Sequence, residues 1–209
     1  GPTPPTLEAS GEAGFARFTR LFTALDQTTR TNAKVAALAA YFREAPEPDR
    51  VWCIALLSGR RPKRILTSSL LRDWAAERAG LPLWLFEESY AVAGDLAETI
   101  ALILPEGAGR HDASLADTIS DLTTLPMLDE AARRARVLAA WDRLGPTERF
   151  VFNKLLTGGF RMGVSAKLMT RALAQATGIA EPDLAHRLMG EWRPDRTTWE
   201  GLVLAPDPR

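Results

Sequence analysis

Apolar residues recur along most of the chain at the three- and four-residue spacing of amphipathic helices. Phe15, Phe18, Leu21, Phe22 and Leu25 share one helical face, which predicts a first helix over 15–25. The same pattern, with Pro and Gly as breaks, predicts further helices at 31–45, 49–57, 67–79, 82–90, 96–104, 129–144, 147–157, 165–177 and 182–189. Ala and Leu far outnumber Val and Ile, which also favours helices over sheets. The sequence therefore predicts an all-α protein.

The ends of these helices carry capping signals. The predicted N-caps are Thr31 or Asn32, one of Thr67, Ser68 and Ser69, and then Thr147 and Ser165. The predicted C-terminal stops are Gly80 and Gly178. Residues 114–126 have no clear pattern, and the Pro-rich tail after Trp192 is expected to lead into a linker. We therefore expect a flexible segment over 1–13, one helical domain over 14–204, and a linker beginning at 205–209.

Composition narrows the class of protein. The 26 basic and 26 acidic residues cancel, which excludes a globally cationic binder but leaves local patches open. Cys53 is the only cysteine and lies in an apolar helix, so no intrachain disulfide and no cysteine metal cluster can form. His111 and His186 are far apart, and no metal site is predicted. No apolar run approaches the ~20 residues that span a bilayer.

Charge is distributed unevenly along the chain. Residues 58–72 hold five cations and no acid, 28–43 hold three cations and no acid, and 145–171 hold five cations and only Glu148. Residues 86–130 hold ten acids and only Arg110. Several basic segments favour a partner with several phosphates, hence a nucleic-acid backbone rather than one nucleotide.

Two stretches of the chain are similar to each other. Leu56-Leu57-Ser58-Gly59, a basic loop, Thr67 and Gly80 correspond to Leu155-Leu156-Thr157-Gly158, a basic loop, Ser165 and Gly178, at an offset of 98 or 99 residues. Chance matches of Leu and Gly are common in helical proteins, so a duplication and a coincidence both remain open. A duplication predicts two helix–loop–helix units, each with a helix N-terminus behind a cationic loop.

The segment 158–167 combines the parts of an anion site: Gly158, Gly159 and Gly163, with Arg161, Ser165 and Lys167. Glycines let the main chain approach a ligand closely, a helix N-terminus attracts anions, and Arg pairs with phosphate oxygens. It is not a nucleotide P-loop, because Gly-Lys-Ser/Thr is missing. Each candidate phosphate contact also has a purely structural interpretation. Gly158-Gly159 can be a helix C-cap, Thr31-Asn32 an N-cap, and residues 60–64 a solvated loop.

Several motifs together resemble one family. They are Phe15-Ala16-Arg17-Phe18, Thr31-Asn32-Ala33-Lys34, residues 57–64, Gly94-Asp95-Leu96-Ala97-Glu98-Thr99, and above all Phe152 to Ser165 with its Gly-Gly-Phe-Arg-Met-Gly-Val-Ser stretch. The chain resembles, over about residues 13–204, the N-terminal DNA-binding domain of bacterial ATP-dependent DNA ligases. The resemblance implies an all-α fold of roughly a dozen helices in two pseudosymmetric halves.

The resemblance also implies a function and a site. Such a domain grips duplex DNA, here expected to be nicked, across the minor groove with little sequence preference, in DNA repair, replication and recombination. The phosphate contacts carried over to this chain are Gly158, Gly159, Arg161, Gly163, Ser165 and Lys167. The related loop contributes Arg60, Arg61, Lys63, Arg64, Thr67 and Ser68, and Thr31, Asn32 and Lys34 form a third, weaker candidate.

One departure from a complete ligase limits the expected chemistry. None of the four lysines lies in the Lys-x-Asp-Gly motif that becomes adenylated, so this chain should bind DNA without sealing nicks. ATP and Mg²⁺ are expected only for the full-length enzyme, whose nucleotidyltransferase and OB domains would be partners of this one. The chain is expected to be a cytoplasmic, nucleoid-associated monomer with no membrane contact. The alternative function is a helical scaffold that binds protein partners through its acidic 86–130 face.

Overall fold

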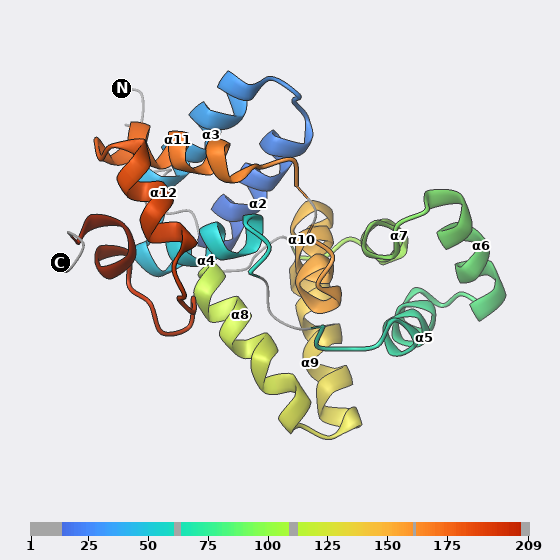
Figure 1. Cartoon of the computed structure of the whole chain (residues 1–209). Helices are drawn as coiled ribbons and strands as arrows, with labels where there is room; N and C mark the ends of the chain where they lie inside the picture. Colours follow the sequence, from blue (N-terminus) through green and yellow to red (C-terminus); the bar gives the residue numbers. More distant parts are fainter. Residues whose placement is uncertain (1–13, 61–63, 109–112, 161, 206–209) are drawn as a thin grey trace, which may run out of the picture. The chain divides into compact units, whose positions relative to one another are not determined.

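The computed structural model describes residues 14–60, 64–108, 113–160 and 162–205, and all regular secondary structure in these ranges is helical (Figure 1). The elements are α2 (Gly14–Asp26), α3 (Thr31–Glu44), α4 (Glu47–Leu57), α5 (Ser68–Ala79), α6 (Leu83–Ala93), α7 (Leu96–Ile103), α8 (Leu115–Thr124), the 3-10 turn η1 (Leu125–Met127), α9 (Glu130–Arg143), α10 (Pro146–Thr157), α11 (Ala166–Thr177), α12 (Glu181–Met189) and the π-helical turn η2 (Glu200–Leu204). The all-α prediction is confirmed. The predicted flexible residues 1–13, and 206–209 of the predicted linker, lie outside the described ranges.

The described chain forms two compact units, each assembled from separate parts of the sequence. The first unit contains residues 14–60, 113–116 and 162–205, and so holds α2, α3, α4, α11, α12 and η2. The second unit contains residues 64–108 and 117–160, and so holds α5, α6, α7, most of α8, η1, α9 and α10. The chain therefore passes from the first unit to the second after α4, returns to the first unit over residues 113–116, and passes from the second unit to the first again after α10.

The internal similarity extends over five consecutive helices. Helix α3 (Thr31–Glu44) and helix α9 (Glu130–Arg143) lie 99 positions apart at both ends. After the basic loops the offset is 98. It relates α5 (Ser68–Ala79) to α11 (Ala166–Thr177) at both ends, and it relates the first residue of α6 to the first residue of α12. Helices α2 to α6 therefore correspond in order to α8 to α12, which favours duplication over coincidence.

The duplication explains how each unit is built. The first unit combines the first three helices of one repeat (α2, α3, α4) with the last two of the other (α11, α12). The second unit combines α8, α9 and α10 with α5 and α6, and adds α7. Equivalent caps confirm the register, because Thr67 accepts a hydrogen bond from the Leu70 N–H as Ser165 does from the Leu168 N–H.

Two predicted N-caps are wrong. The Thr28 hydroxyl accepts a hydrogen bond from the Arg30 N–H at 3.1 Å and turns the chain early, so Arg30 is the N-cap of α3 and Thr31 and Asn32 are its first two residues. Helix α10 begins at Pro146 behind Gly145, rather than at Thr147. Proline is favoured at the first helical position because its φ is already helical and its missing N–H needs no partner.

Two segments gained structure that the sequence pattern did not show. The ambiguous stretch 114–126 contains α8, whose Leu115, Ile119 and Leu122 are buried. The tail after Trp192 ends in η2, and both Trp199 just before η2 and Val203 within it are buried in the first unit. These residues extend the core of the first unit to the end of η2.

The only cysteine is part of the core of the first unit, as the apolar pattern of its helix predicts. The Cys53 side chain is fully buried, and burial followed by the nearby Asp49 carboxylate raises the pKa of its thiol well above the ordinary value. A buried neutral thiol is a poor nucleophile. We expect Cys53 in the native protein to react with a nitrobenzoate disulfide reagent only as fast as the protein unfolds. Rapid stoichiometric labelling without denaturant would contradict this burial.

Candidate nucleic-acid interface

The first unit places the start of α3 beside the start of α11, two segments more than 120 residues apart in sequence. At one end, the Lys34 Nζ donates a hydrogen bond to the Gly163 carbonyl oxygen at 3.1 Å, just before α11 begins. At the other end, the Arg43 guanidinium donates to the Gln175 carbonyl oxygen at 2.9 Å. Helices α3 and α11 therefore run in the same direction and lie side by side (Figure 1).

Two helix N-termini at one end of a unit create a positive electrostatic potential. The first N–H groups of a helix have no partner within the helix, and the dipoles of parallel helices add. Neither α3 nor α11 has an acidic residue in its first turn. The start of α3 receives no hydrogen bond from a capping side chain, and the start of α11 is capped only by Ser165. The arrangement suits an anion that accepts hydrogen bonds from main-chain amides.

Side chains add formal positive charge at the same end. The Arg171 guanidinium donates to the Asn32 Oδ1 at 2.9 Å, so α11 contributes a cation directly against the first turn of α3. Lys167 and Arg171, one turn apart on α11, are both exposed, and Lys34 is half-buried. We call the group Thr31, Asn32, Lys34, Gly163, Ser165, Lys167 and Arg171 the α3–α11 end.

The α3–α11 end brings together six of the residues predicted from the sequence. They are Thr31, Asn32 and Lys34 from the weakest candidate, and Gly163, Ser165 and Lys167 from the strongest one. The sequence reasoning missed Arg171 as a member of the site. Its position one helical turn after Lys167 on the exposed face of α11 was the signal that could have found it.

The glycine pair Gly158-Gly159, which precedes this end in the sequence, terminates helix α10 in the second unit. Gly158 ends α10 with φ 71°, in the left-handed region that favours glycine, and the Gly159 N–H donates to the Lys154 carbonyl oxygen at 3.1 Å. The pair therefore forms a helix C-cap, as the structural interpretation of the sequence predicts. Its use as a phosphate contact stays a prediction. Arg161 lies outside the described residues.

The second predicted loop is divided between the units. In the first unit, the Arg60 guanidinium donates to the carbonyl oxygens of Leu188, Gly190 and Trp192 at 2.8–3.2 Å and lies 4.6 Å above the centre of the Trp192 ring. These contacts fasten the end of α12. In the second unit, Arg64 is exposed and Thr67 caps α5 just before Ser68. Arg61 and Lys63 lie outside the described residues.

Two cations of the basic segment 145–171 are internal to the second unit. Arg149 is 1% exposed, and its guanidinium donates hydrogen bonds to the main-chain carbonyl oxygens of Trp141, Ala101 and Pro105. Lys154 donates to the Asp95 carboxylate. Burial by itself raises the pKa of Asp95, but hydrogen bonds from Lys154 and from the Glu98 and Ala97 N–H groups hold that pKa below its ordinary value. The sequence charge count therefore overstates the cations that this segment presents to a ligand.

Several acids of the 86–130 segment also have structural tasks. Glu87 pairs with Arg72 at 3.3 Å, Asp95 caps α7, and Asp129 caps α9. Exposed apolar side chains interrupt the acids, since Trp84 just before the segment is 63% exposed and Val92 within it is 90% exposed. Protein binding through this face stays a prediction.

The described residues offer no obvious place for a metal ion or a membrane span. Nowhere among them do three or more His, Cys, Asp or Glu side chains gather as metal ligands would. Within the same ranges, no helix has the length and apolar character needed to cross a membrane.

Comparison with known proteins identifies the family. The DNA ligase N terminus family matches residues 14–174 of this chain. A protein of Opitutus terrae described as a probable DNA ligase is 26% identical over 85% of the chain. The matched part amounts to 23% of that relative's length, so this chain spans about a quarter of it. The family match covers more than three quarters of the chain, both basic loops and the α3–α11 end, and the chain therefore belongs to the DNA ligase N terminus family.

Proposed function

We propose that this chain binds duplex DNA through its phosphates, as the substrate-gripping part of an ATP-dependent DNA ligase. The observation that carries the proposal is the α3–α11 end, where two parallel helix N-termini lie together with Ser165 and three cations. Family membership supports DNA as the source of the phosphates. Binding to nicked DNA, and roles in repair, replication and recombination in the cytoplasm, belong to the same proposal.

The α3–α11 end would hold phosphates in two ways. The N–H groups in the first turns of α3 and α11 would donate hydrogen bonds to phosphate oxygens, and Lys34, Lys167 and Arg171 would supply charge-assisted contacts. Main-chain donors carry no information about bases, so binding of this kind reads the spacing and shape of the backbone. The protein would therefore show little sequence preference.

We propose that this chain itself holds neither the ATP nor the Mg²⁺ of a complete ligase. None of its four lysines is followed by the x-Asp-Gly of an adenylation motif, and the described residues gather no metal-ligand cluster. We propose that ATP, Mg²⁺ and bond formation belong to the nucleotidyltransferase and OB domains of a complete enzyme. This chain would act as a monomer that holds the substrate near them, which raises its local concentration.

The test is DNA binding at a series of salt concentrations. We expect fluorescence anisotropy with a labelled nicked duplex to give a slope of log Kd against log salt with a magnitude of about 4–7, from several phosphate contacts. Replacing Lys34, Lys167 or Arg171 by Gln should weaken binding equally for different sequences and reduce that slope by about 1 each. Intact duplex measured in parallel shows whether the nick contributes.

Arg136→Gln is the matched control, because Arg136 is an exposed cation of α9 that belongs to neither basic loop. It removes the same charge and should leave the DNA slope unchanged. A flat salt response of the wild-type protein would overturn phosphate binding. Equal losses in Arg136→Gln and in the three other variants would show that net charge, rather than the α3–α11 end, drives binding.

A further inference from the structure

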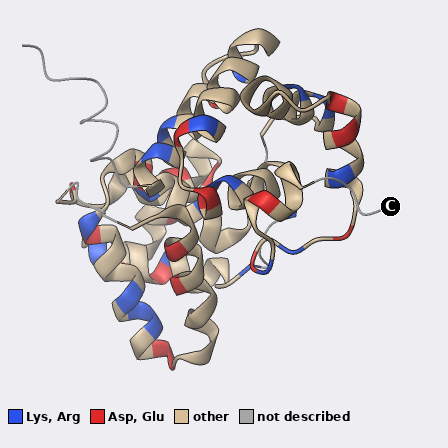
Figure 2. Ribbon diagram, turned by 90° about the vertical axis from the view of Figure 1, so that its left-hand side faces the viewer, with Lys and Arg blue, Asp and Glu red and all other residues tan. Residues whose placement is uncertain are grey.

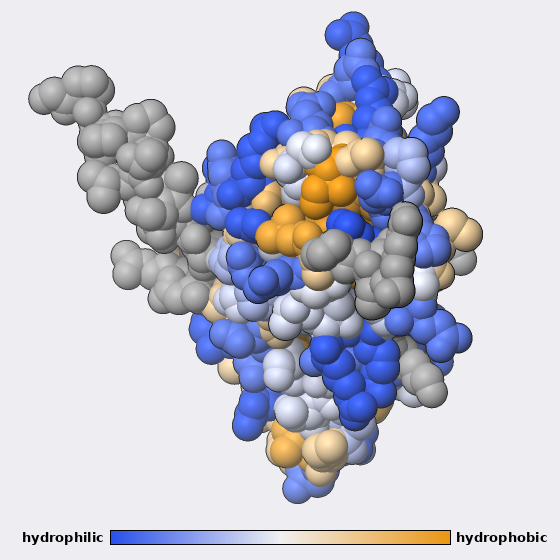
Figure 3. Space-filling view, turned by 60° about the vertical axis from the view of Figure 1, so that its left-hand side comes forward, coloured by the Kyte–Doolittle hydropathy of each residue, from blue (hydrophilic) through white to orange (hydrophobic). Residues whose placement is uncertain are grey.

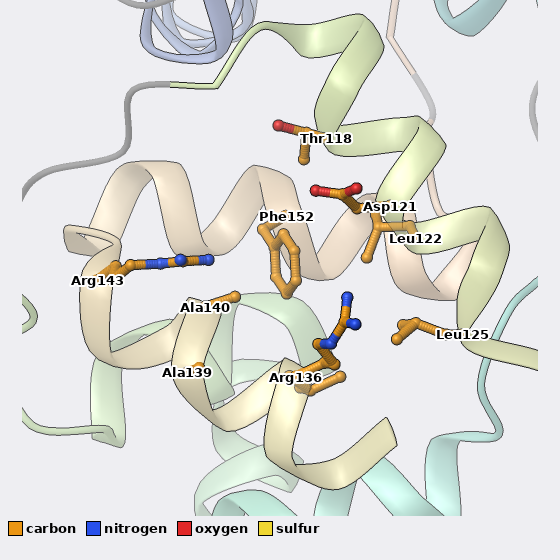
Figure 4. A pocket seen from close by; sticks show the side chains of 10 residues that line it. Thr118, Asp121, Leu122, Leu125, Arg136, Ala139, Ala140, Arg143 and Phe152 are labelled. Carbon is orange, nitrogen blue, oxygen red and sulfur yellow. The ribbon is translucent and has the colours of Figure 1, made fainter. Parts of the chain in front are cut away.

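The second unit contains a hollow of about 320 Å³ between α8, η1, α9 and α10. Its apolar lining comes from Leu122, Leu125, Val137 and Phe152, and Figure 4 shows the Phe152 ring lying between the helices. A hollow of this size takes a side chain or a small molecule, since ligand pockets begin at roughly 300 Å³. No part of the proposed DNA contact uses it.

The duplication shows what is missing from the hollow. Helix α2 aligns with α8 at an offset of 100, where buried Phe15, Phe22 and Leu25 correspond to buried Leu115, Leu122 and Leu125. At this offset Phe18 corresponds to Thr118. Between α3 and α9 the offset is 99, and Tyr41 corresponds to Ala140.

In the first unit these two positions form an aromatic pair. The Phe18 and Tyr41 rings are buried and meet edge to face, with their centres 6.2 Å apart. In the second unit Thr118 and Ala140 stand in their places, and both line the hollow. Phe152, which corresponds to Cys53, restores one ring, so the hollow has about the room of one aromatic side chain that the other repeat supplies itself.

Charged side chains also line this hollow. Arg136 and Arg143 are seven residues apart on α9, and both guanidinium groups point into the hollow, with the Asp121 carboxylate opposite them on α8 (Figure 4). Arg136 and Arg143 are exposed and form no ion pair within the described residues. The corresponding residues of α3 are Ala37 and Glu44. Figure 2 shows cations and acids together on the helices at the bottom of the view: α8 carries Asp117 and Asp121 and no cation, whereas α9 carries four arginines besides Glu130 and Asp142.

We propose that the hollow binds an aromatic side chain with neighbouring carboxylates, presented by a segment of a partner protein. The ring would take the space that Phe18 and Tyr41 fill in the other repeat, against Phe152. The carboxylates would pair with Arg136 and Arg143, and Asp121 would accept a hydrogen bond from a segment N–H. At the corner η1 Met127 is 86% exposed, and Figure 3 shows a small hydrophobic patch at the bottom of the molecule.

The test uses the capped peptide acetyl-Glu-Phe-Glu-amide as the probe, followed by amide chemical shifts of the whole chain. We expect saturable shifts confined to α8, η1, α9 and α10. Two control peptides are acetyl-Glu-Ala-Glu-amide and acetyl-Lys-Phe-Lys-amide. The Kd of each should be at least roughly tenfold higher, because each peptide lacks one of the two recognised groups. Arg136→Gln and Arg143→Gln should weaken binding of the first peptide to a similar extent.

A second pair of variants tests the hollow itself. Ala140→Tyr restores the residue of the other repeat and should abolish peptide binding, and Ala140→Leu fills the same space with less bulk should the tyrosine disturb folding. Lys167→Gln should leave peptide binding unchanged, whereas Arg136→Gln should leave DNA binding unchanged, so either proposal can fail alone. Equal binding of the three peptides, shifts centred outside the hollow, or competition by duplex DNA for the probe would overturn the inference.

Discussion

Replacing Arg149 by methionine is expected to lower the free energy of unfolding by about 3–5 kcal/mol, because several buried carbonyl oxygens lose their donor at once. The Arg149 guanidinium donates two hydrogen bonds to the Trp141 carbonyl oxygen, at 2.7 and 3.2 Å, one to Pro105 at 2.8 Å and one to Ala101 at 3.2 Å. These contacts join the ends of α7 and α9 to the start of α10. Urea unfolding followed by circular dichroism measures the loss.

Arg50→Met is the matched control, since Arg50 lies 99 positions before Arg149 and the duplication makes the two residues equivalent. Arg50 donates to the Ala45 carbonyl oxygen at 2.7 Å and to Arg43 at 3.3 Å, at the end of α3, and lies 5.0 Å above the Trp199 ring centre. It is partly exposed, so water can reach its acceptors after the change. We expect a loss of about 1–2 kcal/mol. Equal losses in the two variants would show that burial does not set the cost.

Local capping chemistry made most helix boundaries predictable. Ser165 and Thr67 begin helices, and Gly80 and Gly178 end them in the left-handed conformation, because these side chains and this backbone freedom act within one turn of the chain. The predicted N-cap was wrong at two helices, where a neighbouring residue favours a different start of the helix. Thr28 displaced the cap of α3 to Arg30, and Pro146 displaced the start of α10 from Thr147.

The candidate site was predictable in its parts but not in its assembly. The sequence marks Lys34 and Ser165 as residues at two helix starts, yet only packing of α3 against α11 brings those starts together. The sequence also cannot separate a cation that faces water from one that fastens the fold. Arg149 and Arg60 were counted among the phosphate-attracting charges, and both donate to main-chain carbonyl oxygens. The hollow in the second unit could not be predicted from the sequence, because it arises where Thr118 and Ala140 come together in the packed helices.

Replacing Asp49 by alanine is expected to cost about 2–4 kcal/mol, because the start of α8 loses its two acceptors. The Asp49 side chain is fully buried, and its two carboxylate oxygens accept hydrogen bonds from the Leu115 N–H at 3.1 Å and the Ala116 N–H at 2.9 Å. Asp129→Ala, at the exposed cap of α9 where the carboxylate accepts from the Ala132 N–H at 2.8 Å, should cost about 1 kcal/mol and serves as the control. Equal costs would contradict a special role for the buried cap.

Gly14 provides an independent measure of how tightly Asp49 is held. A Cβ atom at Gly14 would lie 2.2 Å from the Asp49 Oδ2, closer than atoms can approach, and 3.2 Å from the Ser114 Cα. Gly14→Ala should therefore destabilise the protein strongly when Asp49 is present, because a carboxylate fixed by two N–H donors cannot move aside. In an Asp49→Ala background the closest clash is gone. The loss in unfolding free energy caused by Gly14→Ala should therefore be smaller than in the wild-type background by at least about 1 kcal/mol, as expected for contacting residues. Additive losses in the double variant would mean that the carboxylate yields freely and that α8 is not anchored through Asp49.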